Sequence, residues 1–127
     1  MSREFIGLHC EDLPWEDGSG IVGMPHIKVK MLQVDEEAGR RDFLILMPAG
    51  FHEPRHSHTG SHVTLILEGR QVINEGELEL GPGDYVYGPA DTPHGPFDYP
   101  VDTELFVSFF DDAIHLPEGD DLPTLRR

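Results

Sequence analysis

The chain has 127 residues, which suits one domain around one hydrophobic core and leaves too little sequence for two. It carries 24 Asp and Glu against 9 Lys and Arg, a formal net charge of -15. This charge repels nucleic acid and anionic membrane surfaces, so we expect neither as a partner. No apolar run approaches the ~18 residues of a membrane-spanning helix. Residues 1–10 lack a secretion signal and the single Cys10 cannot form an internal disulfide, so we expect a cytoplasmic protein.

Turn-forming residues favour an all-β fold. The chain contains 14 Gly and 11 Pro, scattered between apolar runs that are too short for helices. Residues 1–25 have no regular pattern and predict an irregular N-terminal arm that is anchored on the domain by a few apolar side chains, Leu13, Trp15, Ile21 and Val22. The remaining domain, about 26–112, is expected to be built of short strands, and residues 113–127 form a C-terminal tail whose end frays.

The strands can be placed in chain order from the apolar pattern. Residues 26–34 alternate, with Ile27, Val29 and Met31 on one side, which predicts a half-buried strand. Residues 43–47 are an unbroken apolar run, ended by proline and glycine, and predict a strand that is buried on both faces. Further strands are expected over three later segments, 63–67, 85–87 and 105–110.

Four of the eight histidines form a pattern that core packing does not explain. His56 and His58 are two residues apart, so an extended segment directs both rings to one face. His62 lies four residues further on, at the start of the next expected strand, and His94 follows in a proline-flanked loop. One or two hairpins between them would bring His94 back beside the first three, giving a site that exists only in the folded chain.

The residues around these histidines resemble the two motifs of the cupin superfamily. Residues 50–69 match the first motif, in which Gly, five residues, His, one residue and His are followed by Glu and a final Gly, except that His62 stands in the place of the Glu. Residues 83–98 are similar to the second motif, with Asp91 in the place of a glycine and Asp98 in the place of an asparagine. Both motifs occur in the usual order and at the usual separation.

This resemblance implies one cupin domain over residues 1–127, a jelly-roll β-barrel that encloses a ligand cavity. It implies that His56, His58, His62 and His94 bind one divalent transition metal. It extends to cupins with an all-histidine iron site, including dioxygenases that cleave diketones or aryl ketones, and to anti-sigma cupins related to ChrR. Similar cupins commonly dimerise, so we expect a homodimer.

The change of Glu to His at position 62 alters the charge of the expected site. Three imidazoles and one carboxylate leave one positive charge on a divalent ion, whereas four neutral imidazoles leave two and favour an anionic or enolisable ligand. Imidazole suits iron, copper, nickel, cobalt, zinc and manganese, of which iron(II) agrees best with the resemblance. A six-coordinate ion would keep two positions for water, substrate or dioxygen.

Three functions agree with these features. The leading hypothesis is a dioxygenase that acts on a small enolisable carbonyl or diketone-like compound chelated to the metal. The alternatives are a metal-dependent isomerase or lyase without redox chemistry, and a cupin that only binds a small molecule or a metal. Glu53 and Asp98 are either partners that orient a ligand imidazole or simply exposed acids. The other four histidines are expected at the surface or in hydrogen bonds.

Overall fold

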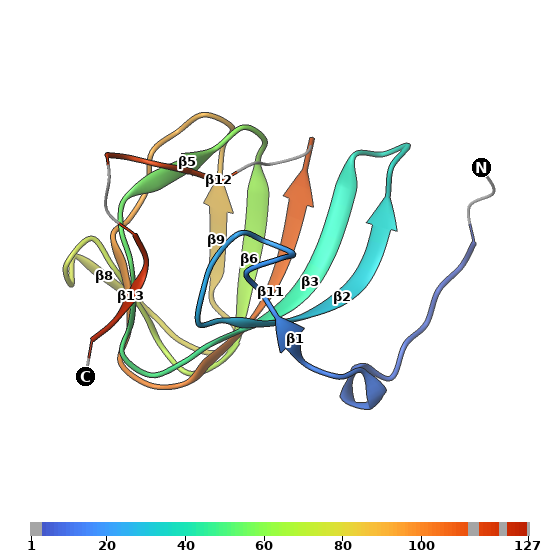
Figure 1. Ribbon diagram of the computed structural model, residues 1–127, viewed down its shortest axis with the longest axis horizontal. Helices are drawn as coiled ribbons and strands as arrows, with labels where there is room; N and C mark the ends of the chain where they lie inside the picture. The colour runs from blue at the N-terminus through green and yellow to red at the C-terminus, as the bar shows by residue number, and fades with distance from the viewer. Residues whose placement is uncertain (1–3, 112–114, 120–121, 127) are drawn as a thin grey trace.

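Short strands make up almost all of the regular structure. The computed structural model describes residues 4–111, 115–119 and 122–126, and in these ranges it contains no α-helix. One turn of 3-10 helix, η1 (Cys10–Asp12), lies in the N-terminal arm, and the described residues before this turn extend away from the body of the molecule (Figure 1). Within the described ranges, no helix has the length and apolar character needed to cross a membrane.

The larger sheet has six antiparallel strands in the order β1-β2-β3-β11-β6-β9. Its strands are β1 (Glu16–Asp17), β2 (Lys28–Asp35), β3 (Arg40–Met47), β6 (His62–Glu68), β9 (Tyr85–Gly88) and β11 (Thr103–Phe110).

The second sheet has five strands in the order β13-β4-β10-β7-β8, and a separate pair joins β5 to β12. These strands are β4 (Phe51–Glu53), β5 (His56–His58), β7 (Gln71–Ile73), β8 (Leu78–Leu80), β10 (Phe97–Tyr99), β12 (His115–Pro117) and β13 (Thr124–Leu125). The two sheets enclose a common interior, as Figure 1 shows. The predicted all-β jelly-roll barrel is thereby confirmed.

The hydrophobic core lies between the sheets and draws side chains from both. Phe51 and Tyr99 of the smaller sheet pack with residues of β3, β6 and β11, such as Phe43, Ile66 and Leu105. The apolar run 43–47 is the second half of strand β3, and the consecutive β3 residues 42–45 are all buried, as expected for a strand covered on both faces.

The N-terminal arm covers the outer face of β2, beside strand β3. Lys30 pairs with Leu44 across β2 and β3, and its ammonium group donates a 2.9 Å hydrogen bond to the carbonyl of Cys10. The same ammonium lies 4.7 Å from the ring centre of Trp15, one of the predicted anchors. The arm also contributes Met24 to the buried core, so part of it belongs to the barrel.

Two segments differ from the sequence predictions. Of the three residues predicted on the inner side, Ile27 and Val29 are buried but Met31 is 43% exposed, and the pairing of β2 with β3 shifts register directly after it, between Met31 and Gln33. The end of the C-terminal tail, residues 120–127, was expected to fray, yet β13 within it pairs with β4; ahead of it, β12 pairs with β5. Backbone pairing to exposed strand edges holds this segment, and residues 120–121 and 127 lie outside the described part.

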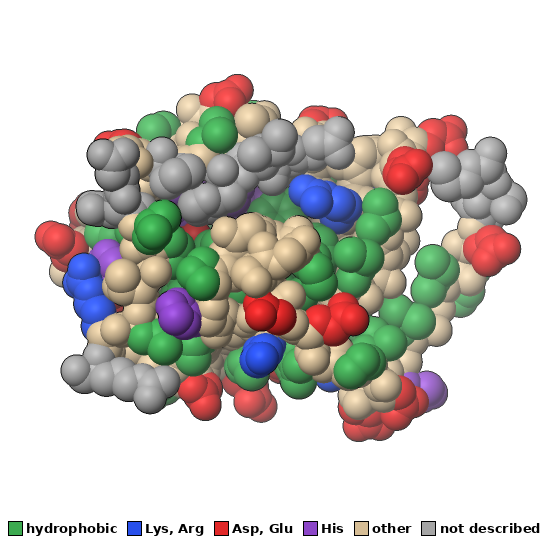
Figure 2. Space-filling model, viewed as in Figure 1, with side chains coloured by type: hydrophobic (Ala, Val, Ile, Leu, Met, Phe, Trp, Pro, Cys, Tyr) green, Lys and Arg blue, Asp and Glu red, His purple; other side chains and the backbone are tan. Residues whose placement is uncertain are grey.

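Acidic side chains are dispersed over the surface. On the face shown in Figure 2, Asp and Glu side chains occur around the whole outline of the molecule and do not form one continuous patch. Such a distribution is typical of charges that keep a surface hydrated.

Candidate metal centre

The fold gathers the four predicted histidines at one end of the barrel interior. His56 and His58 lie on β5 and are both buried, with the half-buried Ser57 between them, as the spacing of two predicts. His62 begins β6 and is also buried. His94 lies in the loop before β10, where its backbone exchanges two hydrogen bonds with that of His56, at 2.8 and 2.9 Å. The distant fourth histidine therefore arrives through backbone pairing.

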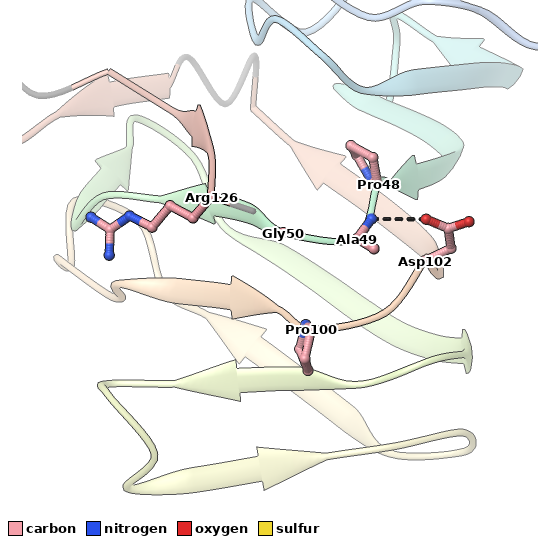
Figure 3. Close-up of a pocket in the computed structure, with 6 residues that line it drawn as sticks. All are labelled: Pro48, Ala49, Gly50, Pro100, Asp102 and Arg126. Carbon is pink, nitrogen blue, oxygen red and sulfur yellow. Dashed lines mark hydrogen bonds between the residues drawn. The ribbon is translucent and has the colours of Figure 1, made fainter.

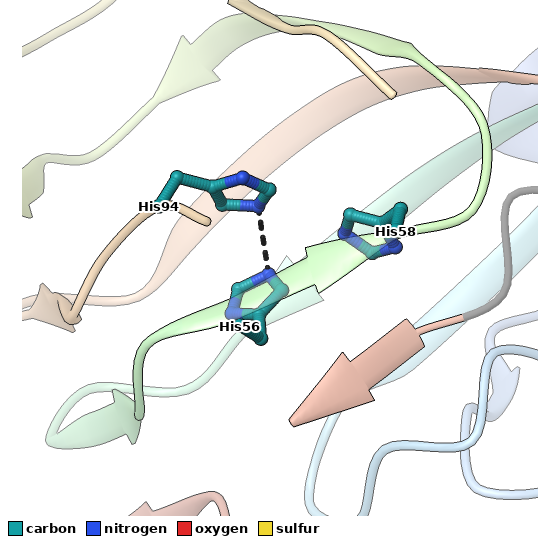
Figure 4. A group of neighbouring side chains, drawn as sticks. All are labelled: His56, His58 and His94. Carbon is teal, nitrogen blue, oxygen red and sulfur yellow. Dashed lines mark hydrogen bonds between the residues drawn. The ribbon is translucent and has the colours of Figure 1, made fainter. Parts of the chain in front are cut away.

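Three of the rings form the tightest group (Figure 4). His56, His58 and His94 each offer one ring nitrogen such that these atoms lie within 4.8 Å of one another. His62 lies beside this trio, with its ring centre 4.9 Å from that of His58 and 5.1 Å from that of His94. All four rings thus meet, and His62 borders the group that is close enough to share one ion.

The hydrogen bonds of the His56 and His94 rings indicate which ring nitrogen carries the proton. His56 Nδ1 lies 2.9 Å from the carbonyl oxygen of Pro54, and His94 Nδ1 lies 3.0 Å from that of Thr92. A carbonyl can only accept, so each neutral ring carries its proton on Nδ1 and a lone pair on Nε2.

These two lone pairs point at each other. The Nε2 atoms of His56 and His94 are 3.0 Å apart, which is unfavourable unless a proton or a cation lies between them. Two ligands at right angles around an ion, with bonds of about 2.1 Å, would be separated by about 3.0 Å. The residues therefore fit a divalent transition metal.

The surroundings of His62 favour the neutral form of its ring. Burial, followed by the neighbouring charges of His94 and His56, lowers the pKa of His62 to about 4, so its ring is uncharged at neutral pH. Its Nδ1 is buried and has no hydrogen-bond partner among the described residues. Gly88 faces it across β6 and β9, and a Cβ atom at Gly88 would lie 2.2 Å from His62 Cε1. The missing side chain of Gly88 makes the space for this ring.

Glu53 and Asp98, whose roles the sequence did not decide, have different surroundings. Glu53 is 4% exposed, faces the interior, and places Oε2 3.3 Å from His56 Nε2. Asp98 instead binds His52, with 2.7 Å between Oδ1 and Nδ1. Asp98 therefore does not orient any of the four clustered imidazoles, and Glu53 belongs to the histidine cavity.

The cavity beside the histidines is small, about 50 Å³. Its walls are mostly apolar and come from both sheets and from the arm. Besides the histidines they include Met24, Ile45, Met47, Glu53, Thr64, Gln71, Val86, Phe97, Tyr99, Leu105, Val107 and Phe109. Tyr85 and Tyr87 are exposed, on the opposite side of β9 from Val86, so neither contacts this cavity.

Gln71 and Tyr99 provide a polar site within these apolar walls. Gln71 Nε2 donates a 2.8 Å hydrogen bond to the Tyr99 hydroxyl, and both residues are buried. Gln71 Oε1 is buried without a hydrogen-bond partner among the described residues. Burial and then the charge of Glu53 raise the pKa of Tyr99, which keeps its hydroxyl protonated. The cavity thus offers one acceptor and one hydroxyl donor. Neither residue stands out in the sequence, because only the fold brings β7 and β10 to the histidines.

A wider hollow of about 540 Å³ lies elsewhere, where the end of β3 meets the C-terminal segment (Figure 3). It is lined by Pro48, Ala49, Gly50, Pro100, Asp102 and Arg126. The carboxylate of Asp102 accepts a 2.8 Å hydrogen bond from the backbone N–H of Ala49, which fixes the turn. With no histidine and with its one acid engaged in this way, the hollow lacks the ligands of a transition-metal site.

Comparison with known proteins agrees with this architecture. The ChrR cupin-like domain family matches residues 3–112, whereas no curated protein matches the chain.

Several solved structures are similar to it in fold. An RmlC-like cupin from Ralstonia eutropha JMP134 is 25% identical, with a TM-score of 0.75 over 97% of this chain and 79% of that one. A putative acetylacetone dioxygenase from Methylibium petroleiphilum PM1 is 21% identical, with a TM-score of 0.71 over 87% and 79%. The polyketide cyclase RemF from Streptomyces resistomycificus is 19% identical, with a TM-score of 0.70 over 93% and 88%. At 21% and 19% identity, the last two similarities show the fold alone.

Proposed function

The chain belongs to the ChrR cupin-like family, and we propose that it is a metal-dependent dioxygenase of a small enolisable carbonyl compound. The observation that carries the metal site is the pair of facing Nε2 lone pairs on His56 and His94, 3.0 Å apart, with the rings of His58 and His62 beside them. His56, His58, His62 and His94 would hold the ion.

The metal would supply the reactivity that the side chains lack. When bound, an ion such as iron(II) provides Lewis acidity toward a carbonyl ligand and electrons for the activation of dioxygen. In the proposed reaction both atoms of dioxygen enter the products as one carbon–carbon bond of the substrate breaks, so no external reductant is needed. The apolar walls around the histidines exclude bulk water from this reaction.

The polar pair in the cavity supports an enolisable substrate. The enol form of a 1,3-diketone carries a hydroxyl donor and a carbonyl acceptor on carbons that are separated by one further carbon. Gln71 Oε1 can accept from the former and the Tyr99 hydroxyl can donate to the latter, and both groups line the same cavity as the histidines. Because buried polar groups without partners are costly, a ligand that satisfies both is favoured over one that cannot.

The size of the cavity limits the substrate. A buried water needs roughly 10–15 Å³ of such space, so a volume of about 50 Å³ holds a ligand of only a few heavy atoms. A larger diketone requires that a wall moves. Met24 is the wall residue best able to do so, because it is unbranched and comes from the arm. The similarity to a putative acetylacetone dioxygenase supports small diketones as the first compounds to test.

Reconstitution with metal tests the proposal. Protein loaded anaerobically with iron(II) should consume dioxygen when a small diketone is added, and the His58→Ala variant should not. Fully loaded protein that consumes none across a broad panel of enolisable carbonyl compounds would contradict the proposal. Conversion by zinc-loaded protein without dioxygen would instead select isomerase or lyase chemistry, and tight ligand binding without conversion would select a binding protein.

A further inference from the structure

We propose that Glu53 supplies the carboxylate of the metal site, in place of the motif glutamate whose position is occupied by His62. The inference rests on metal binding by the histidines and is independent of any oxygenase reaction. It revises the charge expected from the sequence, because a divalent ion beside four imidazoles and Glu53 would keep one positive charge.

The direction of Glu53 follows from strand alternation. Phe51 and Glu53 are buried on the inner face of β4, while His52 between them points outward to Asp98. A helix or a loop would not fix this orientation, whereas β4 is paired on one side with β10 and on the other with β13. The carboxylate is therefore held in the cavity by the same sheet that contributes Tyr99.

The position of Glu53 relative to His56 distinguishes two possible roles. A carboxylate that only orients a metal-binding imidazole hydrogen-bonds to the nitrogen that faces away from the metal. In His56 that nitrogen is Nδ1, which is occupied by the Pro54 carbonyl. Glu53 Oε2 lies instead 3.3 Å from Nε2, the nitrogen that faces His94. Glu53 is thus on the side of the ring where the ion would bind.

The spacing also fits a shared ion. The separation of 3.3 Å is close to the about 3.0 Å expected for two neighbouring ligands with bonds of about 2.1 Å. His56 Nε2 is therefore the atom that both neighbours approach, with His94 Nε2 at 3.0 Å and Glu53 Oε2 at 3.3 Å. Like His62, Glu53 lies beside the trio of closest rings rather than within it. Such a gathering of lone pairs and negative charge in a buried space is stabilised by a cation.

Cobalt(II) binding to the full chain provides the test. Glu53→Gln keeps the size of the side chain and removes its charge, and Glu79→Gln is the matched control on an exposed position of β8. We expect Glu53→Gln to weaken cobalt(II) affinity about 10–100-fold in competition with a chelator and to change the visible absorption spectrum of the bound ion. Glu79→Gln should leave both unchanged.

Two further measurements separate a site carboxylate from a structural one. Metal-free Glu53→Gln should melt at the wild-type temperature or above, because the substitution removes a negative charge from a cluster of acceptors. The double variant Glu53→Gln with His62→Glu should recover at least tenfold in cobalt(II) affinity over Glu53→Gln alone.

Wild-type affinity and spectrum in Glu53→Gln would overturn the inference, as would a large loss of stability in its metal-free form. Failure of the wild type to bind cobalt(II) would instead overturn the histidine site itself.

Discussion

Acidification should destabilise the metal-free protein through His62. Its pKa is lowered to about 4 in the folded chain by burial and by its histidine neighbours, whereas the ordinary value is 6.5. As the pH falls from about 6.5 to about 4, His62 becomes protonated in the unfolded chain but stays neutral in the folded chain. The free energy of unfolding therefore decreases over this range. The stabilising contribution is complete above about pH 7 and is lost progressively down to about pH 4.

The size of the effect follows from the two pKa values. A difference of about 2.5 pKa units corresponds to about 3 kcal/mol, of which about 2.5 kcal/mol is lost between pH 7.5 and pH 4.5. His62 is only 7% exposed, so solvent screening reduces this little. The experiment is urea denaturation of wild type and His62→Gln at several pH values in the presence of a chelator. Gln does not titrate, so the other histidines contribute equally to both proteins.

The expected result is a change in the difference between the two proteins. The free energy of unfolding of wild type relative to His62→Gln should fall by about 2 to 3 kcal/mol from pH 7.5 to pH 4.5. A difference that stays constant over this range would refute the reasoning, because it would mean that His62 titrates alike in the folded and unfolded chains.

Three other substitutions test separate parts of the site. Gly88→Ala should displace the His62 ring, destabilise the metal-free protein by about 1–3 kcal/mol in urea denaturation and weaken metal binding. Unchanged stability and unchanged metal affinity would contradict the close approach of the two residues. Met24→Ala should lower the free energy of unfolding by about 2–5 kcal/mol and should shift the substrate preference toward larger diketones. An unchanged preference would show that Met24 does not limit the size of the cavity. Gln71→Leu should weaken binding of an enolisable ligand about tenfold in calorimetric titration, because it removes a hydrogen bond worth about 1.4 kcal/mol, while the metal content stays at the wild-type level. Equal ligand affinity of variant and wild type would show that Gln71 does not bind the ligand.

Local patterns in the sequence were sufficient to predict five of the six strands of the larger sheet and the common face of His56 and His58. The spacing of His56 and His58 determines their common direction on β5 because successive side chains of a strand alternate. The run 43–47 was identified as a doubly covered strand from its composition alone. These features depend on neighbouring residues, so the sequence displays them directly.

Features that depend on long-range contacts could not be predicted in this way. Met31 is exposed although it continues the alternation, and the register shift that follows it in the pairing of β2 with β3 leaves no pattern in β2 itself. Pairing of β13 with β4 requires that the chain end returns to an open strand edge. The same limit applies to Gln71, whose approach to Tyr99 joins residues 28 positions apart.

Glu53 illustrates the limit most clearly. From the sequence, Glu53 was either an exposed acid or a partner that orients a ligand imidazole. Only the structure shows that His56 Nδ1 is taken by the carbonyl of Pro54 and that the carboxylate lies at Nε2, the nitrogen that faces His94.

Elemental analysis of the purified chain tests the central claim most directly. After supplementation with iron(II) or zinc and removal of loosely bound ions, the wild type should retain about one divalent ion per chain, and a variant with both His56→Ala and His94→Ala should retain none. A correctly folded wild-type chain without any bound ion would contradict the account.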